Sequence, residues 1–345
     1  MKMKNMRRIA CTLLVLVIVC FTGAEAGVRS GGRELIPLGK TVGVEINAGG
    51  LLITALTTVE SKEGTLCPAR KAGLASGDLI VAINGIATPD IRSFAEILSA
   101  EGEKSAKLSV IRSGIAFETD VLPVCDLEGD IHIGIMVKDT VEGIGTMTYY
   151  DPQEQIFAAL GHGINDSGIL MPLWHGRITR ASVTAAVKGE RGAPGHLEGD
   201  FDLSSNLGEI RSNTECGIFG GPLNEDLFKG SGPVPVASIS QVECGAAVIY
   251  ANVYGEEVRE YGVEIVKING DAKDSYKDLL IRVTDPELLE MTGGIVQGMS
   301  GSPIIQNGMI IGAVTHVLVD DPTRGYAISI EKMLEAGGSA LENAA

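Results

Sequence analysis

The sequence is poor in aromatic residues, and it lacks the cysteine and histidine spacings that bind metals. Aromatic side chains make up 4% of its 345 residues, with one tryptophan. Neither C-x-x-C nor H-E-x-x-H occurs, so no motif indicates a zinc finger or the common type of zinc peptidase. We therefore expect no metal and no cofactor.

Positive charge is also scarce. The chain has 28 Lys and Arg against 44 Asp and Glu, a formal net charge of -16. Nucleic acids and anionic lipid surfaces are bound through basic patches. We therefore expect neither to be the main partner of this protein.

No apolar run reaches the roughly 20 residues that a membrane-spanning helix needs. Four basic residues among the first eight precede an apolar run from Ile9 to Phe21, which small residues around Ala24 and Ala26 follow. This order is typical of a secretory leader. We expect a signal peptide over residues 1–26, or a retained signal anchor, with the body of the chain outside the cytoplasm.

Cysteines outside this leader are few and widely spaced: Cys67, Cys125, Cys216 and Cys244. An oxidising compartment would permit a Cys216–Cys244 disulfide. Four cysteines allow three sets of pairings, however, and the sequence does not choose among them.

Glycine is abundant, with 45 residues, and short runs of Val and Ile lie between Gly, Asn and Asp. This pattern is typical of strands joined by tight turns and predicts a mainly β protein. We expect helices at 91–100, around 287–289 and at 330–336. The length favours two domains, which we place at 35–124 and 129–345.

The first domain contains the stretch Ala72-Gly73-Leu74, Gly77-Asp78 and Asn84-Gly85, which resembles PDZ domains of bacterial proteases. Such a resemblance implies a groove that binds extended peptides by strand addition. Its carboxylate-binding loop would be the Φ-Gly-Φ turn of Thr41, Val42, Gly43 and Val44, with Lys40 adding positive charge. The alternative is a PDZ fold whose groove holds only its own chain.

The second domain contains a serine between glycines, in Gly298-Met299-Ser300-Gly301-Ser302-Pro303. A tight glycine turn exposes a serine Oγ and lets nearby amides converge as an oxyanion hole. We predict Ser300 as the nucleophile of a serine peptidase, with the amides of Gly298 and Ser300 as the hole. Ser302 is a weaker alternative, because the following proline favours extended backbone.

A nucleophilic serine needs a base. His162 lies between two glycines after an apolar strand and is the best candidate. His316 lies within an apolar strand, which favours a packed core histidine. The remaining histidines, His132, His175 and His196, have no comparable setting.

The base in turn needs a group that orients it, usually a carboxylate. Asp285 is one candidate, although Asp before Pro and Glu is also a good helix N-cap. Asp200 and Asp202 are rivals that lie nearer to His162 in the sequence. The residues alone leave this choice open.

Three segments, 143–164, 213–220 and 284–328, resemble the stage IV sporulation protein B peptidase family. The resemblance implies a chymotrypsin-like double β-barrel and a catalytic set that maps onto His162, Asp285 and Ser300. It also implies self-cleavage near the N-terminus and release into the space between forespore and mother cell.

The same resemblance implies that the peptidase cuts a regulatory subunit of a membrane-embedded metalloprotease complex, so that a late mother-cell sigma factor is processed. In such proteins the PDZ domain restrains the peptidase and recognises its target. A non-catalytic alternative is an exported PDZ adaptor that signals by binding peptides.

Overall fold

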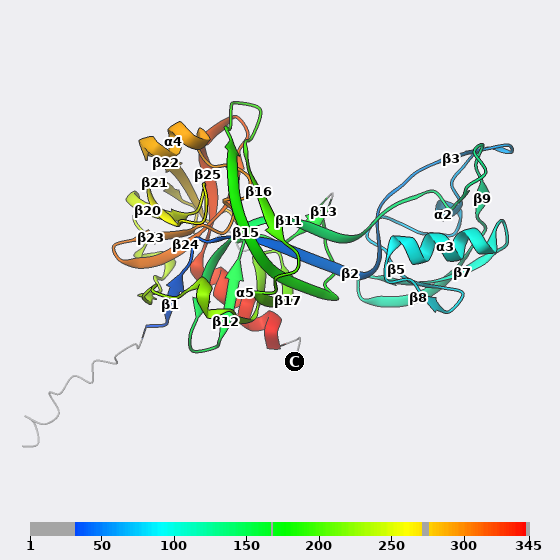
Figure 1. Cartoon of the computed structure of the whole chain (residues 1–345), viewed down its shortest axis with the longest axis horizontal. Helices are drawn as coiled ribbons and strands as arrows, with labels where there is room; N and C mark the ends of the chain where they lie inside the picture. The colour runs from blue at the N-terminus through cyan, green and yellow to red at the C-terminus, as the bar shows by residue number, and fades with distance from the viewer. Residues whose placement is uncertain (1–31, 167, 271–275, 343–345) are drawn as a thin grey trace, which may run out of the picture. The chain divides into compact units, whose positions relative to one another are not determined.

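A computed structural model describes residues 32–166, 168–270 and 276–342 (Figure 1). Contacts divide the chain into Met1–Arg33 and Glu34–Ala345, and the described helices and strands all lie in the second unit. The leader predicted for residues 1–26 lies outside the described residues. Within the described ranges no helix has the length and apolar character to cross a membrane.

The first β-barrel is a closed ring of six strands. The ring closes because β2 pairs with β11 on one side and with β15 on the other. Buried Ile46, Phe157 and Ile218 are part of its core. In ring order its strands are β2 (Thr41–Leu56), β11 (Ile135–Asp151), β12 (Ile156–Ala159), β18 (Gly217–Leu223), β17 (Gly208–Thr214) and β15 (His175–Val187).

The second barrel also closes on itself. Buried Ile249, Ile281 and Val314 are part of its core. Two closed barrels confirm the predicted chymotrypsin-like double β-barrel. Around the ring the strands are β20 (Gly245–Ala251), β21 (Arg259–Ile268), β22 (Leu279–Val283), β25 (Asp321–Ser329), β24 (Met309–Leu318) and β23 (Pro303–Gln306).

Shorter elements complete this part of the chain. Two of the three predicted helices lie in this part of the chain, as α4 (Pro286–Thr292), which a left-handed Gly293 ends, and α5 (Ile330–Glu342). The remaining elements are β1 (Glu34–Pro37), β13 (Asn165–Asp166), β14 (Ile169–Leu170), β16 (His196–Asp202), η1 (Glu225–Leu227), β19 (Val234–Pro235) and η2 (Ile239–Gln241).

A separate lobe, here called the inserted lobe, is built from residues 51–138. Asp78 is buried and its carboxylate accepts hydrogen bonds from the Arg112 side chain. Asn84, at φ 52°, and Gly85 form the predicted hairpin turn. Its elements are β3 (Val59–Ser61), β4 (Gly64–Leu66), α2 (Pro68–Lys71), β5 (Leu79–Ile83), β6 (Ile86–Ala87), α3 (Ile91–Glu101), β7 (Ala106–Arg112), β8 (Ile115–Val121), β9 (Val124–Cys125) and β10 (Ile131–His132).

Two long strands connect this lobe to the first barrel. Residues 42–47 of β2 pair with barrel strand β15, whereas Leu51 and Leu52 pair with β5 of the inserted lobe. β11 pairs with β2 along both parts (Figure 1). The lobe is therefore inserted between two strands of one barrel, which differs from the predicted division at residues 35–124 and 129–345.

The predicted peptide-binding loop, Thr41 to Val44, is corrected by this pairing. These residues are buried in β2, between β11 and β15, so neither edge is open to a peptide. Gly43 is needed for packing, since a Cβ there would lie 2.2 Å from Oγ1 of Thr179. Lys40 donates to the backbone carbonyl of Glu256 and lies near the Glu256 carboxylate.

The four cysteines outside the leader are free thiols, so the Cys216–Cys244 disulfide is absent. Cys216 is buried and Cys244 is exposed. Burial raises the pKa of the Cys216 thiol to about 11, which keeps it protonated and unreactive at neutral pH.

Candidate active site and peptide groove

Ser300 lies on the turn that enters β23, between two glycines with positive φ. Gly298 and Gly301 both have φ 99°, a conformation that favours glycine. A Cβ on Gly301 would lie 2.0 Å from the carbonyl oxygen of Thr146. The tight turn that the sequence predicts therefore depends on Gly301.

Two amides of this turn, those of Gly298 and Ser300, are available for the predicted oxyanion hole. Met299 N donates to Val296 O, and Gly301 N donates to Val314 O. The amides of Gly298 and Ser300 have no acceptor among the described residues. Unpaired backbone donors on both sides of Met299 are what a developing oxyanion requires.

The first barrel holds this turn of the second. Thr146, on β11, donates its amide to Ser300 O at 3.1 Å and its Oγ1 to Gly298 O at 2.7 Å. These bonds leave the amides of Gly298 and Ser300 free, because they use only the carbonyls. The Oγ of Ser300 donates to Thr315 O at 2.8 Å. In this state, therefore, the serine proton is directed to a carbonyl and must turn to reach a base.

His162 lines the same cavity as Ser300. Its Nδ1 lies 2.9 Å from the carbonyl of Gly163. A carbonyl only accepts, so Nδ1 carries the proton and Nε2 keeps its lone pair. Burial lowers the pKa of His162, and the Gly163 bond raises it by less. The ring is therefore neutral at neutral pH, as a general base must be.

His316 is exposed and lines this cavity, which corrects the prediction of a packed core histidine. Its ring centroid lies 5.2 Å from that of His162. The pairing of β24 with β25 shifts register between Val314 and His316. A bulge of this kind re-aims a side chain, and strand alternation in the sequence does not reveal it.

Asp285 is the N-cap of α4, and the structure does not bring it to His162. Its Oδ1 accepts from the amides of Glu287 and Leu288, and its Oδ2 accepts from Gly262. No carboxylate among the described residues contacts His162 or shifts its pKa. The contacts of Asp285 are those of a helix N-cap, which is the alternative that the sequence offered. The group that accepts from the His162 ring is the Gly163 carbonyl and not a carboxylate.

The rival residues are also elsewhere. Asp200 and Asp202 are exposed on β16, where Asp202 accepts from Ser204. Ser302 is fully buried, and its Oγ has no partner within the described ranges. Of the predicted triad and its alternatives, Ser300, His162 and His316 line the cavity, whereas the carboxylates and Ser302 do not.

The cavity lies between the barrels and has a volume of about 490 Å³. No charged Asp, Glu, Lys or Arg is among its described lining residues. The apolar residues come from both barrels and are Val44, Val141, Ile144, Leu160, Ile164, Ile295, Val296, Val317 and Val319. This lining suits an uncharged side chain beside Ser300.

Sequence reasoning missed three groups: the Gly163 carbonyl, Thr146 and Thr315. Thr146 contacts the Ser300 turn from a strand more than 150 residues away, and the groups of Gly163 and Thr315 that act here are backbone carbonyls. The one sequence signal near these three groups was the pair of glycines, Gly161 and Gly163, on either side of His162. Gly163 is packed so closely that a Cβ would lie 2.6 Å from Thr214 O.

A family model, SpoIVB peptidase S55, matches residues 129–334, well over half of the chain. The chain belongs to the SpoIVB peptidase S55 family. A second family model, a PDZ domain, matches residues 65–112, within the inserted lobe.

Relatives of known name cover parts of this S55 peptidase. A Lactococcus lactis protein named as a zinc metalloprotease is 36% identical over 119 residues, 33% of this chain and 27% of its own length. The chain thus spans about a quarter of that relative. The PDZ domain of the SdrC-like protein of Listeria monocytogenes is 22% identical, over 24% of this chain and 87% of that one, with TM-score 0.20.

The Rv3671c protease from M. tuberculosis, in its active form, is a further solved structure to which the chain is similar. It is 17% identical, over 57% of this chain and 73% of that chain, with TM-score 0.30.

The PDZ domain of the S55 peptidase has a groove of about 730 Å³ beside α3. A second Φ-Gly-Φ run, Ile133-Gly134-Ile135, lies at this groove and leads into β11. Gly134 has φ 79°, and a Cβ there would lie 2.6 Å from Thr57 O. The Φ-Gly-Φ run at this groove is therefore the later one, at residues 133–135, and not the run at residues 41–44 that the sequence predicted.

Proposed function

We propose that this S55 peptidase is an exported endopeptidase in which Ser300 is the nucleophile and His162 the general base. The observation that carries the proposal is that both side chains line one cavity, at the turn whose Gly298 and Ser300 amides lack acceptors within the described chain. A nucleophile, a neutral base and an oxyanion hole are the parts that acyl transfer needs.

In the proposed mechanism the Ser300 hydroxyl turns from Thr315 O toward His162. Nε2 of His162 takes the proton while Oγ attacks the peptide carbonyl, and the two free amides stabilise the oxyanion. The protonated imidazole, held through Nδ1 by Gly163 O, then gives its proton to the leaving amine. Water hydrolyses the acyl-enzyme by the same steps, with His162 again as base.

The substrate residue next to the cleaved bond would be uncharged and apolar, because the cavity has no charged lining side chain among the described residues. Peptides with Val or Leu at this position should be cleaved faster than peptides with Lys or Asp.

Membership of the family supports a more specific role in sporulation. We propose self-cleavage near the N-terminal segment, export across the cytoplasmic membrane and release between forespore and mother cell. We also propose cleavage of a regulatory subunit of a membrane metalloprotease complex, which would permit processing of a late mother-cell sigma factor. In cells, Ser300→Ala should then accumulate full-length chain and unprocessed sigma factor.

Labelling by a fluorophosphonate probe tests the catalytic part. The wild-type chain should label, Ser300→Ala should not, and turnover should fall by about 10⁶. Ser302→Ala is the matched control: it removes a buried hydroxyl without a partner in the described chain, so labelling should persist.

A folded wild-type chain that neither labels nor hydrolyses peptides would instead favour the non-catalytic PDZ adaptor. Labelling that survives in Ser300→Ala would place the nucleophile elsewhere. Activity should be unchanged by a chelator, and loss of activity would favour a metal-dependent reaction.

A further inference from the structure

The PDZ groove has an apolar floor and one open strand edge. Phe94 and Leu98 of α3 face it from one side, and Ile135 and Val137 of β11 from the other. Residues 135–138 pair with β2 along one edge, and no described strand pairs with the opposite edge. An extended peptide can therefore add to β11 and place alternate side chains on the apolar floor.

The charges around this groove all have one sign. The charged residues that line it are Glu60, Asp126, Glu128 and Asp130, and no Lys or Arg is among the described lining residues. Glu128 and Asp130 are exposed. They lie just before the Ile133-Gly134-Ile135 run, at the end where a PDZ carboxylate loop would be.

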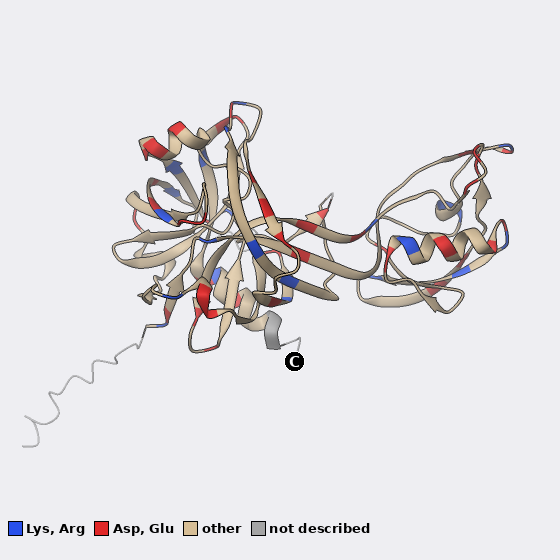
Figure 2. Ribbon diagram, viewed as in Figure 1, with Lys and Arg blue, Asp and Glu red and all other residues tan. Residues whose placement is uncertain are grey.

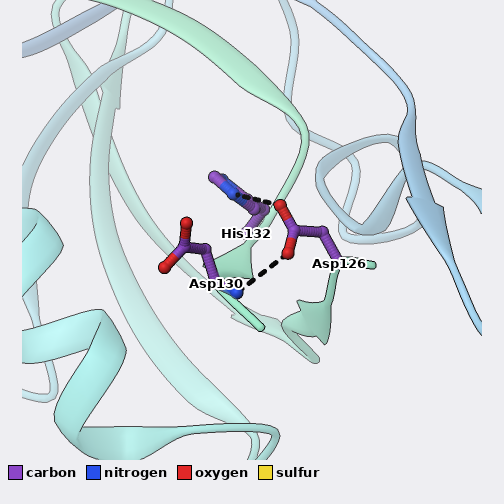
Figure 3. Close-up of side chains that lie close together, drawn as sticks. All are labelled: Asp126, Asp130 and His132. Carbon is purple, nitrogen blue, oxygen red and sulfur yellow. Dashed lines mark hydrogen bonds and ion pairs between the residues drawn. The ribbon is translucent and has the colours of Figure 1, made fainter. Parts of the chain in front are cut away.

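Figure 3 shows three side chains at this end, Asp126, Asp130 and His132. Oδ1 of Asp126 accepts from the amides of Glu128, Gly129 and Asp130, and its Oδ2 lies 3.2 Å from Nε2 of His132. Asp126 therefore shapes the loop, which accounts for the proximity of these groups without a metal ion. Hydrogen bonding by these amides keeps its pKa low and its charge in place.

From this arrangement we infer that the PDZ groove binds an internal peptide segment in which basic side chains alternate with apolar ones, and that it discriminates against a free C-terminal carboxylate. The acidic rim of the groove attracts Lys or Arg side chains of a peptide, and it repels acidic side chains and a terminal carboxylate. A terminal carboxylate would lie among Glu128, Asp130 and Asp126 with no described basic side chain to offset them.

A second copy of this chain is a poor occupant. The formal net charge is -16, and acidic side chains are spread over the barrels and the PDZ domain (Figure 2). Two such surfaces repel each other at low ionic strength. The groove therefore suits a basic segment of another protein.

The inference rests on the PDZ domain and not on catalysis, so its test measures binding alone. We would use full-length Ser300→Ala protein and fluorescence anisotropy of labelled peptides with amidated C-termini. The first probe alternates Val and Lys. The others replace Lys by Glu, replace Val by Ser, or leave the C-terminal carboxylate free.

The Val–Lys amide should bind most tightly, and the Val–Glu peptide at least about tenfold more weakly. The free carboxylate and the Ser–Lys peptide should also bind more weakly, and added salt should weaken the Val–Lys peptide. Tighter binding of the free carboxylate would overturn the inference. Equal binding of Ser–Lys and Val–Lys would mean that only net charge acts, and would overturn it as well.

Charge reversal locates the site. Glu128→Lys combined with Asp130→Lys should invert the preference toward the Val–Glu peptide. Asp120→Lys, on β8 in the same domain but outside the groove lining, is the matched control and should leave the preference unchanged. Failure of the double variant to change the preference would overturn the inference, whether or not the chain proves to be a peptidase.

Discussion

Thr146 of the first barrel binds the backbone of Ser300 in the second, amide to carbonyl, at 3.1 Å. Its Oγ1 also donates to Gly298 O. One buried threonine thus fixes both carbonyls of the segment whose amides would form the oxyanion hole. The geometry of that hole consequently depends on contact between the barrels.

Thr146→Val should lower the labelling rate at Ser300 and destabilise the fold. Valine keeps the shape and leaves Gly298 O without this donor, which costs about 1–3 kcal/mol for a buried acceptor. Thr148→Val is the control, since Thr148 is on the same strand, fully buried, and its Oγ1 has no partner in the described chain. Denaturant unfolding and labelling kinetics check both variants. Equal effects would show that the Gly298 bond has no special role.

The rate of labelling should depend on pH through His162. Its pKa is lowered, mainly by burial, so the neutral base is present at neutral pH and is lost as the pH falls through the folded-state pKa. The midpoint should lie below the ordinary histidine value of 6.5. His316→Asn should keep this acid limb, and His162→Ala should abolish labelling. A midpoint above 6.5 would contradict the role of burial.

Asp285→Ala should reduce stability and leave chemistry intact. The substitution removes the acceptor for the amides of Glu287 and Leu288, which costs about 0.5–2 kcal/mol for an N-cap. Asp285→Asn retains an acceptor and should cost less. Thermal unfolding and labelling of the folded protein separate the two roles. A fall in labelling of about 10⁴ at unchanged stability would instead make Asp285 the third member of a triad.

Gly301→Ala should abolish labelling and destabilise the second barrel. Its φ is 99°, and the added Cβ would lie 2.0 Å from Thr146 O and 2.5 Å from Leu160 N. Gly308→Ala is the matched control: φ is 76° and no atom lies within 4 Å of its Cβ. The control should show only the backbone strain of about 1–2 kcal/mol. Similar losses in both variants would mean that the close contact does not matter.

Much of the fold followed from local pattern. Alternating Val and Ile between glycines predicted the β architecture, and Asn84-Gly85 and Gly301 marked turns that the structure contains. Ser300 and His162 could be found because glycines on both sides expose a side chain. Their chemical roles remain predictions until labelling is measured.

The errors share a physical cause. A Φ-Gly-Φ run can lie at the edge of a groove or within a strand that is paired on both sides, and both occur here, around Gly134 and Gly43. Local sequence cannot decide between them, because the difference lies in what pairs with each edge. Likewise, the bulge at His316 and the contacts of Asp285 depend on partners from other strands.

Because β2 and β11 each serve both the barrel and the PDZ domain, the peptidase cannot be isolated by cutting the chain at one point. A fragment starting at residue 129 would lack residues 41–47 and leave β11 and β15 with open edges. Asn47 and Thr140 are register partners across the two strands. Replacing the chain between them with a short hairpin should give a PDZ-free enzyme with the six-stranded ring intact, whereas simple truncation should expose strands that aggregate.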